Sequence, residues 1–313
     1  MQLRTTPWPG RLTLPAIAAP MTTVSGPELV ISACRAGVIG AFPTHNAPTT
    51  EDLDNWMLHI RRELESSPTP VAPVAPNLVV HGSNRRLTAD LDCLANHGPE
   101  LVITSVGSPA PVVGKLHAVG TKVYADVASL QHARRALDAG ADGLILLTAG
   151  AGGQTGWANP FAFVRAVREQ FDGPLVLAGG ISDGTTILAA QVLGVDLTYL
   201  GTRFIATRQS AASAEYRQAL VNSTLDDVRL SDRVGGIPAS LLTCWLEDQQ
   251  DGDDAPGKRG FAQSRLIDNR TAWSAGHSVS GVHAVADVAE LVADLTQQYL
   301  AARNAFFQLV TNE

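Results

Sequence analysis

The chain alternates between short apolar runs and longer segments in which apolar residues recur every three or four positions. Eight of the short runs are rich in β-branched residues and apolar throughout, without an alternation of apolar and polar positions. Strands of this kind are covered on both faces, as the strands of a parallel sheet are. The eight predicted strands cover residues 14–20, 38–42, 71–80, 101–106, 122–127, 143–148, 174–180 and 197–201.

The segments between these runs have the spacing of amphipathic helices, most clearly at residues 129–140 and 183–194. A glycine separates a helical stretch from the following strand at Gly37, Gly120, Gly140 and Gly194. Glycine at this place is typical of a helix that ends in a left-handed turn. The repeating unit is therefore a strand followed by a helix.

Eight strand–helix units in succession predict an α/β fold of the TIM (β/α)8 barrel type over residues 1–221. A doubly wound open sheet is the alternative, because periodicity does not reveal closure. Residues 222–283 break the rhythm with the polar stretch "EDQQDGDDAPGKRG" (247–260). We expect an irregular segment there that either covers the active site or is simply exposed. Residues 284–313 predict a final helix that packs on the barrel.

The composition and net charge of the chain limit the kinds of molecule that it is expected to bind. The 313 residues are 45% hydrophobic, which is enough for a large core, and the formal charge of −7 leaves no basic face for nucleic acid. The three cysteines form no CxxC pair and no histidines have HExxH spacing, so we expect no disulfide frame and no metal. Neither a signal peptide nor a membrane span is indicated, which favours a cytoplasmic protein that acts on small molecules.

In a barrel, the loops that follow the strands share one face, and ligands bind there. "AGGISDG" (178–184) follows the seventh predicted strand and "GTRF" (201–204) follows the eighth. Their exposed N–H groups would meet at one corner and hold a phosphate. The sequence thus assigns Gly179, Gly180, Gly201 and Thr202 to a phosphate site, with simple tight turns as the alternative.

Other loops on the same face offer contacts for a flat ligand. The small residues from Ala149 to Gly153 would let a planar ring approach the backbone, and "AAPM" (18–21) would offer main-chain bonds to a ring edge. Asn77 and Asp126 end the third and fifth predicted strands. Both would add polar contacts to the ligand, with ordinary loop hydrogen bonding as the alternative.

Several motifs in this order resemble the nitronate monooxygenase, or 2-nitropropane dioxygenase, family across nearly the whole chain. They are "AAPM", "NLVVHGSN" (77–84), "AGAGGQTG" (149–156), "LAGGISDG" (177–184), "GTRFIAT" (201–207) and "WSAGHSVSGV" (273–282). The resemblance implies a TIM barrel that holds FMN without a covalent bond.

Position by position, the resemblance implies which residues contact the cofactor. It places Ala19, Pro20 and Met21 along the isoalloxazine edge, Asn77 near the ring, Ala149 and Gly150 beside it, and Gly179, Gly180, Gly201 and Thr202 around the phosphate. Asp126 stands where some relatives have lysine and others aspartate, so its role is less defined.

One position departs from the family pattern. Relatives commonly have "AGGH", with a histidine credited with acid–base work, where this chain has Gln154. Glutamine does not titrate and cannot take a proton from a nitroalkane. We therefore expect Gln154 to orient the substrate. An already ionised nitronate needs only electron transfer to the flavin, so it is the expected substrate in place of a neutral nitroalkane.

Further candidates lie in the same loops. Two histidines are candidate bases because they follow the second and third predicted strands: His45 and His81. The family resemblance also places His277 near the flavin. For all three, a surface or packing role is the alternative. Trp157 would form a wall of the substrate pocket or pack in the core. Ser274 would reach the ligand.

The leading hypothesis is an FMN-dependent oxidoreductase that oxidises a nitronate with O2 to a carbonyl compound and nitrite. The alternatives are a flavin reductase that passes hydride from NAD(P)H to an enoyl thioester or quinone, and a specialised biosynthetic flavoenzyme. The physiological substrate, the pathway and the oligomeric state stay open, with a homodimer as one option.

Overall fold

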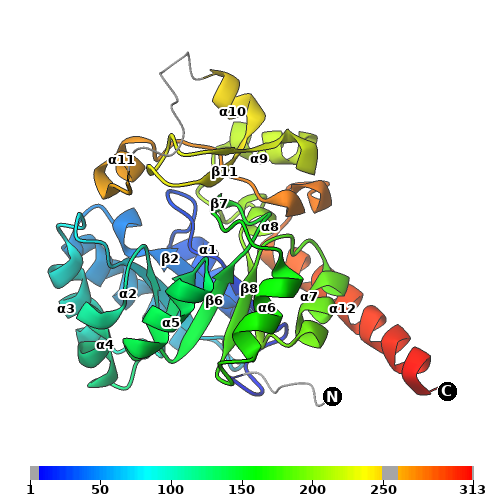
Figure 1. Cartoon of the computed structure of the whole chain (residues 1–313), viewed down its shortest axis with the longest axis horizontal. Helices are drawn as coiled ribbons and strands as arrows, with labels where there is room; N and C mark the ends of the chain where they lie inside the picture. Colours follow the sequence, from blue (N-terminus) through cyan, green and yellow to red (C-terminus); the bar gives the residue numbers. More distant parts are fainter. Residues whose placement is uncertain (1–6, 249–259, 312–313) are drawn as a thin grey trace.

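The structure, a computed structural model that describes residues 7–248 and 260–311, is built on a closed barrel of eight parallel strands (Figure 1). Each strand pairs with the next along the chain, and β1 also pairs with β9, with Ile17 opposite Tyr199. An open sheet would leave two edges, so the TIM barrel prediction is confirmed. The barrel strands are β1 (Ala16–Ala18), β2 (Ile39–Pro43), β3 (Val74–Val79), β4 (Leu101–Ser105), β5 (Lys122–Val127), β6 (Gly143–Leu147), β8 (Leu175–Ala178) and β9 (Leu197–Leu200).

Helices cover the outside of this barrel. They are α1 (Pro27–Arg35), α2 (Thr50–Glu65), α3 (Leu87–His97), α4 (Ala110–His117), α5 (Leu130–Asp138), α6 (Pro160–Arg168) and α7 (Gly184–Leu193). The short α8 (Thr202–Ile205) follows β9, and α9 (Ala214–Asn222) lies near β11 (Figure 1). The 3-10 turns are η1 (Thr44–Asn46), η2 (Leu225–Asp227) and η3 (His277–Gly281). Side-chain caps fix several starts. Thr49 and Asp183 both take part in capping boxes, which satisfy backbone N–H groups at the first turn.

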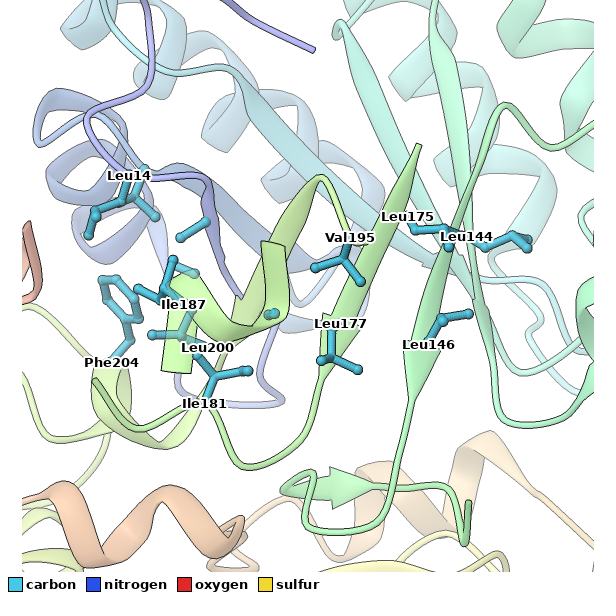
Figure 2. Close-up of a cluster of buried hydrophobic side chains, with 14 of the residues drawn as sticks. Leu14, Leu144, Leu146, Leu175, Leu177, Ile181, Ile187, Val195, Leu200 and Phe204 are labelled. Carbon is cyan, nitrogen blue, oxygen red and sulfur yellow. The ribbon is translucent and has the colours of Figure 1, made fainter. Parts of the chain in front are cut away.

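Both faces of the strands are buried, which explains the continuous apolar runs. In β6, Ile145 points into the cluster inside the barrel, whereas its neighbours Leu144 and Leu146 belong to the layer between barrel and helices. Figure 2 shows part of that outer layer, where Leu177 of β8 and Ile187 of α7 lie in the same cluster. Two-sided burial is what the absence of alternation predicted.

The four glycines predicted to end helices all have positive φ, from 80° at Gly37 to 117° at Gly194. At Gly37 space also excludes a side chain, because a Cβ there would lie 2.2 Å from the Thr13 hydroxyl oxygen. The turn that leads into β2 therefore depends on glycine for both its φ and its close approach to residue 13.

A small second sheet lies over one end of the barrel (Figure 1). Its strands are β10 (Val228–Ser231), β11 (Ala239–Leu242) and the two-residue β7 (Gly153–Gln154), in the order β10-β11-β7 and antiparallel. Helices α10 (Thr243–Asp248) and α11 (Gln263–Asp268) accompany it. The segment expected to be irregular therefore carries two strands. Much of the polar stretch at 247–260 lies outside the described residues.

Helix α12 (Val288–Thr311) runs along the barrel and packs on α7. The two helices approach so closely that a Cβ at Gly184 would lie 2.1 Å from the Tyr299 backbone nitrogen. The Tyr299 hydroxyl donates to Gln191 Oε1 at 2.6 Å. Among the described residues, no helix combines the length and apolar character needed to cross a membrane.

Candidate active site

A deep cavity lies between the carboxyl ends of the barrel strands and the small sheet above them. The space among its lining residues, including the part open to solvent, is about 1380 Å³. Of the residues expected from the sequence, it is lined by Ala19, Pro20, Met21, His45, Asn77, Asp126, Gly150, Gln154, Gly179, Gly180, Gly201, Thr202 and Ser274.

The loop after β1 is held by its own hydrogen bonds. The Ser25 hydroxyl accepts from Met21 N at 3.0 Å and donates to Ala19 O at 3.2 Å, while Ala19 N donates to Leu200 O at 2.9 Å. Because these bonds tie the loop to β9, the backbone of residues 19–21 presents a fixed edge to the cavity.

The two glycine loops after β8 and β9 both line the cavity, through Gly179, Gly180, Gly201 and Thr202. Gly179 and Gly180 have φ of 124° and 70°, and a Cβ on Gly180 would meet no atom within 4 Å. That position opens into the cavity. The Thr202 hydroxyl oxygen accepts from Gly276 N at 2.9 Å, which leaves its O–H free to donate elsewhere.

Glycine is required in the 149–153 loop for a structural reason that the sequence did not reveal. A Cβ on Gly152 would lie 2.7 Å from Gly276 N, and one on Gly150 would lie 2.9 Å from His277 Nδ1. His277 N donates to Gly150 O at 2.9 Å. The loop is therefore small because another segment of the chain packs against it, whatever else it contacts.

Gln154 lies on β7, opposite Ala239 of β11. Pairing with the small sheet fixes its backbone, and its side chain lines the cavity near Gly235. The amide can donate and accept a hydrogen bond there, but it does not titrate and so cannot act as a base.

His45 is half-buried and neutral. Its Nε2 lies 3.0 Å from the Thr22 hydroxyl, whereas its Nδ1 is buried without a partner. Burial lowers the pKa of His45 to about 4, with the nearby Arg86 charge adding to the effect. At neutral pH the ring can form a hydrogen bond but carries no positive charge.

Polar groups also stand at the ends of β3, β4 and β5. Asn77 Nδ2 donates to the Ser105 hydroxyl at 3.2 Å, so these two side chains satisfy one another. Asp126 differs, because its Oδ1 is buried without a partner and burial raises its pKa to about 8. The Tyr199 hydroxyl on β9 is likewise buried without a partner.

The structure does not bring four expected residues to the cavity wall. Trp157 is 85% exposed, so it does not wall the described pocket. His81 does not line the pocket either. Its Nδ1 lies 2.8 Å from the Ser83 hydroxyl, and its ring packs edge-on against Phe261. His277 and Ala149 are exposed, and both are tied to neighbours through their backbone N–H groups. Direction of the side chain after a strand end, which the sequence does not fix, accounts for these differences.

Several lining residues were not expected from the sequence. Tyr199 lies two positions before Gly201, so its place near a strand end was a usable signal. The residues of the small sheet and its neighbouring segments, here called the cover, gave no usable sequence signal, because that part of the chain shows no periodicity. They are Val234, Gly235, Ile237, Ala239, Leu266, Asn269, Arg270 and Ala272.

One group of possible metal ligands lies outside the cavity, in Asp54, Cys93 and His97. His97 Nε2 contacts Asp54 Oδ1 at 2.7 Å, and Arg61 contacts His97 Nδ1 at 3.2 Å. Arginine can only donate, so Nδ1 accepts and Nε2 carries the proton that Asp54 accepts. Within the described chain, these hydrogen bonds account for the cluster without a cation.

Fold and cavity together define a barrel enzyme with a ligand site at the carboxyl ends of its strands. The nitronate monooxygenase family model matches residues 79–298, which is most of the chain. The chain belongs to the nitronate monooxygenase family, and it is an oxidoreductase of that generally flavin-dependent class.

Individual relatives are distant. A nitronate monooxygenase from Paraburkholderia phytofirmans is 25% identical, with 92% of this chain and 90% of the relative covered. A (3aS,4S,5R,7aS)-5-hydroxy-7a-methyl-1-oxo-octahydro-1H-indene-4-carboxyl-CoA dehydrogenase from Rhodococcus jostii is 27% identical over 74% of this chain, which spans 63% of that relative.

Solved structures share the fold across nearly all of the chain. FabK from Thermotoga maritima has a TM-score of 0.81 at 22% identity, covering 96% of this chain and 97% of that one. Nitroalkane oxidase from Streptomyces ansochromogenes has a TM-score of 0.79 at 24% identity, covering 94% and 98%.

Proposed function

We propose that the protein binds FMN and oxidises an alkyl nitronate with O2 to a carbonyl compound and nitrite. Two nitronates and one O2 give two carbonyl compounds and two nitrite ions, so no further reductant is needed. The proposal rests chiefly on one observation: the positive-φ glycine turn after β8 and the Gly201–Thr202 turn after β9 line the same cavity at the carboxyl ends of the barrel strands.

The residues present fit a flavin phosphate and ring. Gly180 opens into the cavity where a side chain would intrude, and Gly179, Gly201 and Thr202 adjoin it. Backbone N–H groups at such turns bind phosphate oxygens. Along the proposed ring site, Met21 and Asn77 offer an apolar contact and an amide, matching a ligand that is flat with polar edges.

When bound, FMN would accept electrons from the substrate and pass them to O2. The protein's own residues would bind and orient the nitronate. The Gln154 amide donates a hydrogen bond to an oxygen of the nitro group but takes no proton, so the substrate must arrive as the anion. Val234, Ile237 and Leu266 of the cover supply an apolar ceiling that limits water.

Anaerobic mixing tests the proposal. Purified protein loaded with FMN is mixed, in the absence of O2, with propionate-3-nitronate. In a separate experiment it is mixed with 3-nitropropionate, the corresponding nitroalkane, in which the carbon next to the nitro group keeps its proton. Loss of the flavin absorbance with the nitronate and not with the nitroalkane is the expected result. A protein that takes up no FMN, or whose flavin is unchanged by any nitronate, would contradict the proposal.

A second candidate keeps the flavin but changes the substrate: hydride from NAD(P)H would be passed to an enoyl thioester or quinone. Two relatives carry the name of a carboxyl-CoA dehydrogenase, and exposed Arg270 stands at the cavity wall where a negatively charged carrier group would pass. Bleaching of the flavin by NADH or NADPH alone, without O2, would favour this candidate over the first.

A further inference from the structure

Three side chains of the cavity wall bury a polar atom without any partner. They are His45 through Nδ1, Asp126 through Oδ1 and Tyr199 through its hydroxyl. A buried polar atom normally has a hydrogen-bond partner, because leaving it unpaired is costly. Three such atoms in one cavity indicate that a ligand completes their hydrogen bonds.

Asp126 and Tyr199 differ from His45 in that each offers an O–H group. Asp126 stands on β5, opposite Ile145 of β6, and Tyr199 stands on β9, opposite Ala178 of β8. The Tyr199 side chain packs on the apolar cluster that fills the barrel. The charge of Asp126 acts on Tyr199 and raises its pKa further, so the two groups are within electrostatic range of one another.

Among the described residues that line the cavity, no buried cation accompanies this pair. The other titratable groups of the described cavity wall are His45, Tyr216 and Arg270. His45 is neutral, the Tyr216 hydroxyl donates to Ser274 O, and Arg270 is exposed. Burial is the sole cause of the raised pKa of Asp126, which means that it keeps its proton at neutral pH.

We propose that the Asp126 carboxylic acid and the Tyr199 phenol form an oxyanion-binding pair on the cavity floor, where both O–H groups donate to one anionic oxygen of a bound ligand. A carboxyl kept neutral by apolar surroundings can serve as such a donor beside a tyrosine. An ionised carboxylate at the same place would repel the anion.

The anionic oxygen has two sources, and both rest on the proposed function. One is the nitro group of the nitronate substrate. The other is the flavin ring, whose carbonyl oxygens gain negative charge when the ring is reduced. The two sources are distinguished by separate measurements on the same variants.

The first measurement uses nitrate, which is planar like the nitro group of a nitronate, stays ionised at every working pH and is not turned over. Its dissociation constant is measured by calorimetry on the purified, cofactor-loaded protein. We expect the affinity to fall as the pH rises through about 8, where Asp126 ionises. Asp126→Asn keeps an N–H donor and no charge, so its affinity should not change with pH.

Tyr199→Phe removes the second donor without changing the shape of the ring. We expect about tenfold weaker nitrate binding at all pH values, with the pH dependence of Asp126 preserved. Tyr299→Phe and Asp92→Asn are the matched controls, because both residues lie on helices outside the cavity. Melting temperature and FMN content confirm that each variant is folded.

The second measurement is the midpoint potential of the bound flavin against pH. If the ring supplies the oxygen, Asp126→Asn and Tyr199→Phe shift the potential while nitrate binding stays as in the wild type. A change in nitrate binding alone assigns the pair to the substrate. If neither quantity moves in either variant, the pair is overturned. Nitrate binding needs no turnover, so a protein inactive on nitronates but with the expected nitrate profile would disprove the proposed function and leave the pair intact.

Discussion

At the scale of single residues, the decisive feature is the carboxyl group of Asp126, whose Oδ1 is buried without a hydrogen-bond partner. Asp126 has an ordinary pKa of 3.8 in the unfolded chain and one of about 8 in the folded protein. Between these values the folded state holds a proton that the unfolded state has released. Its contribution to stability is therefore present at low pH and is lost as the pH rises towards 8.

This direction of the pH dependence of stability gives a testable prediction for the protein without cofactor. As the pH rises from about 5 to about 8, the wild type should lose stability relative to Asp126→Asn, by at most about 1.4 kcal/mol per pH unit. Urea unfolding at several pH values measures the difference. Parallel pH profiles for the two proteins would show that Asp126 is not held neutral.

Gln154 gives a second prediction. Gln154→His would introduce a titratable ring at the cavity wall, and a positioned base typically accelerates proton abstraction by ~100-fold or more. We expect oxidation of a neutral nitroalkane to rise by roughly that factor while the rate with nitronate changes little. Initial rates of nitrite formation report both. Gln154→Asn, which keeps an amide, is the control, and its rate of nitroalkane oxidation should not rise. An equal increase in that variant would show that the missing base at position 154 is not what limits the reaction.

Residues that follow strand ends were within reach of sequence analysis, whereas the direction of their side chains was not. Gly179, Gly180 and Gly201 stand in short loops whose position the barrel dictates. His81 and His45 occupy similar places in the sequence, yet only His45 faces the cavity. That difference arises from local partners such as Ser83 and Thr22, which no spacing reveals.

At the scale of elements, the eight barrel strands were predictable because each is short, apolar and buried on both faces. The small sheet was not. β7 has two residues, and the residues of β11 that pair with it lie more than 80 positions further along the chain. Pairing of this kind follows from the loop packing between residues 150–153 and 274–277, which depends on backbone proximity and leaves no periodic pattern.

That packing supplies a third prediction. Gly152→Ala would place a Cβ 2.7 Å from Gly276 N and 2.9 Å from Ala275 C, both backbone atoms that cannot rotate away. The two loops must separate, so we expect a loss of about 1–3 kcal/mol in stability and weaker FMN binding. Thermal unfolding and FMN titration measure these effects.

Gly114→Ala is the matched control for this change. It lies in α4, where a Cβ meets no atom within 4 Å, so alanine should stabilise the protein by about 0.5–1 kcal/mol. Equal behaviour of the two alanine variants would mean that the loop contact does not shape the site.

At the scale of the whole molecule, the cavity depends on parts far apart in the chain. The cover is contributed by residues 234–239 and 266–272, and α12 returns to the barrel after it and packs on α7, the helix that follows the Gly179–Gly180 turn. Figure 1 shows α12 running beside α7 and away from the cover. The last helix therefore packs behind the proposed phosphate corner through its contact with α7.

The contribution of this contact can be measured with two leucines of the same helix. Leu295 is 1% exposed within the outer core, whereas Leu300 is 39% exposed. Truncation of a buried leucine typically costs about 2–5 kcal/mol, so Leu295→Ala should lower the free energy of unfolding by that amount and Leu300→Ala by well under half of it. Urea unfolding followed by tryptophan fluorescence compares them. Equal losses of stability in the two variants would show that α12 is not anchored on the barrel as described.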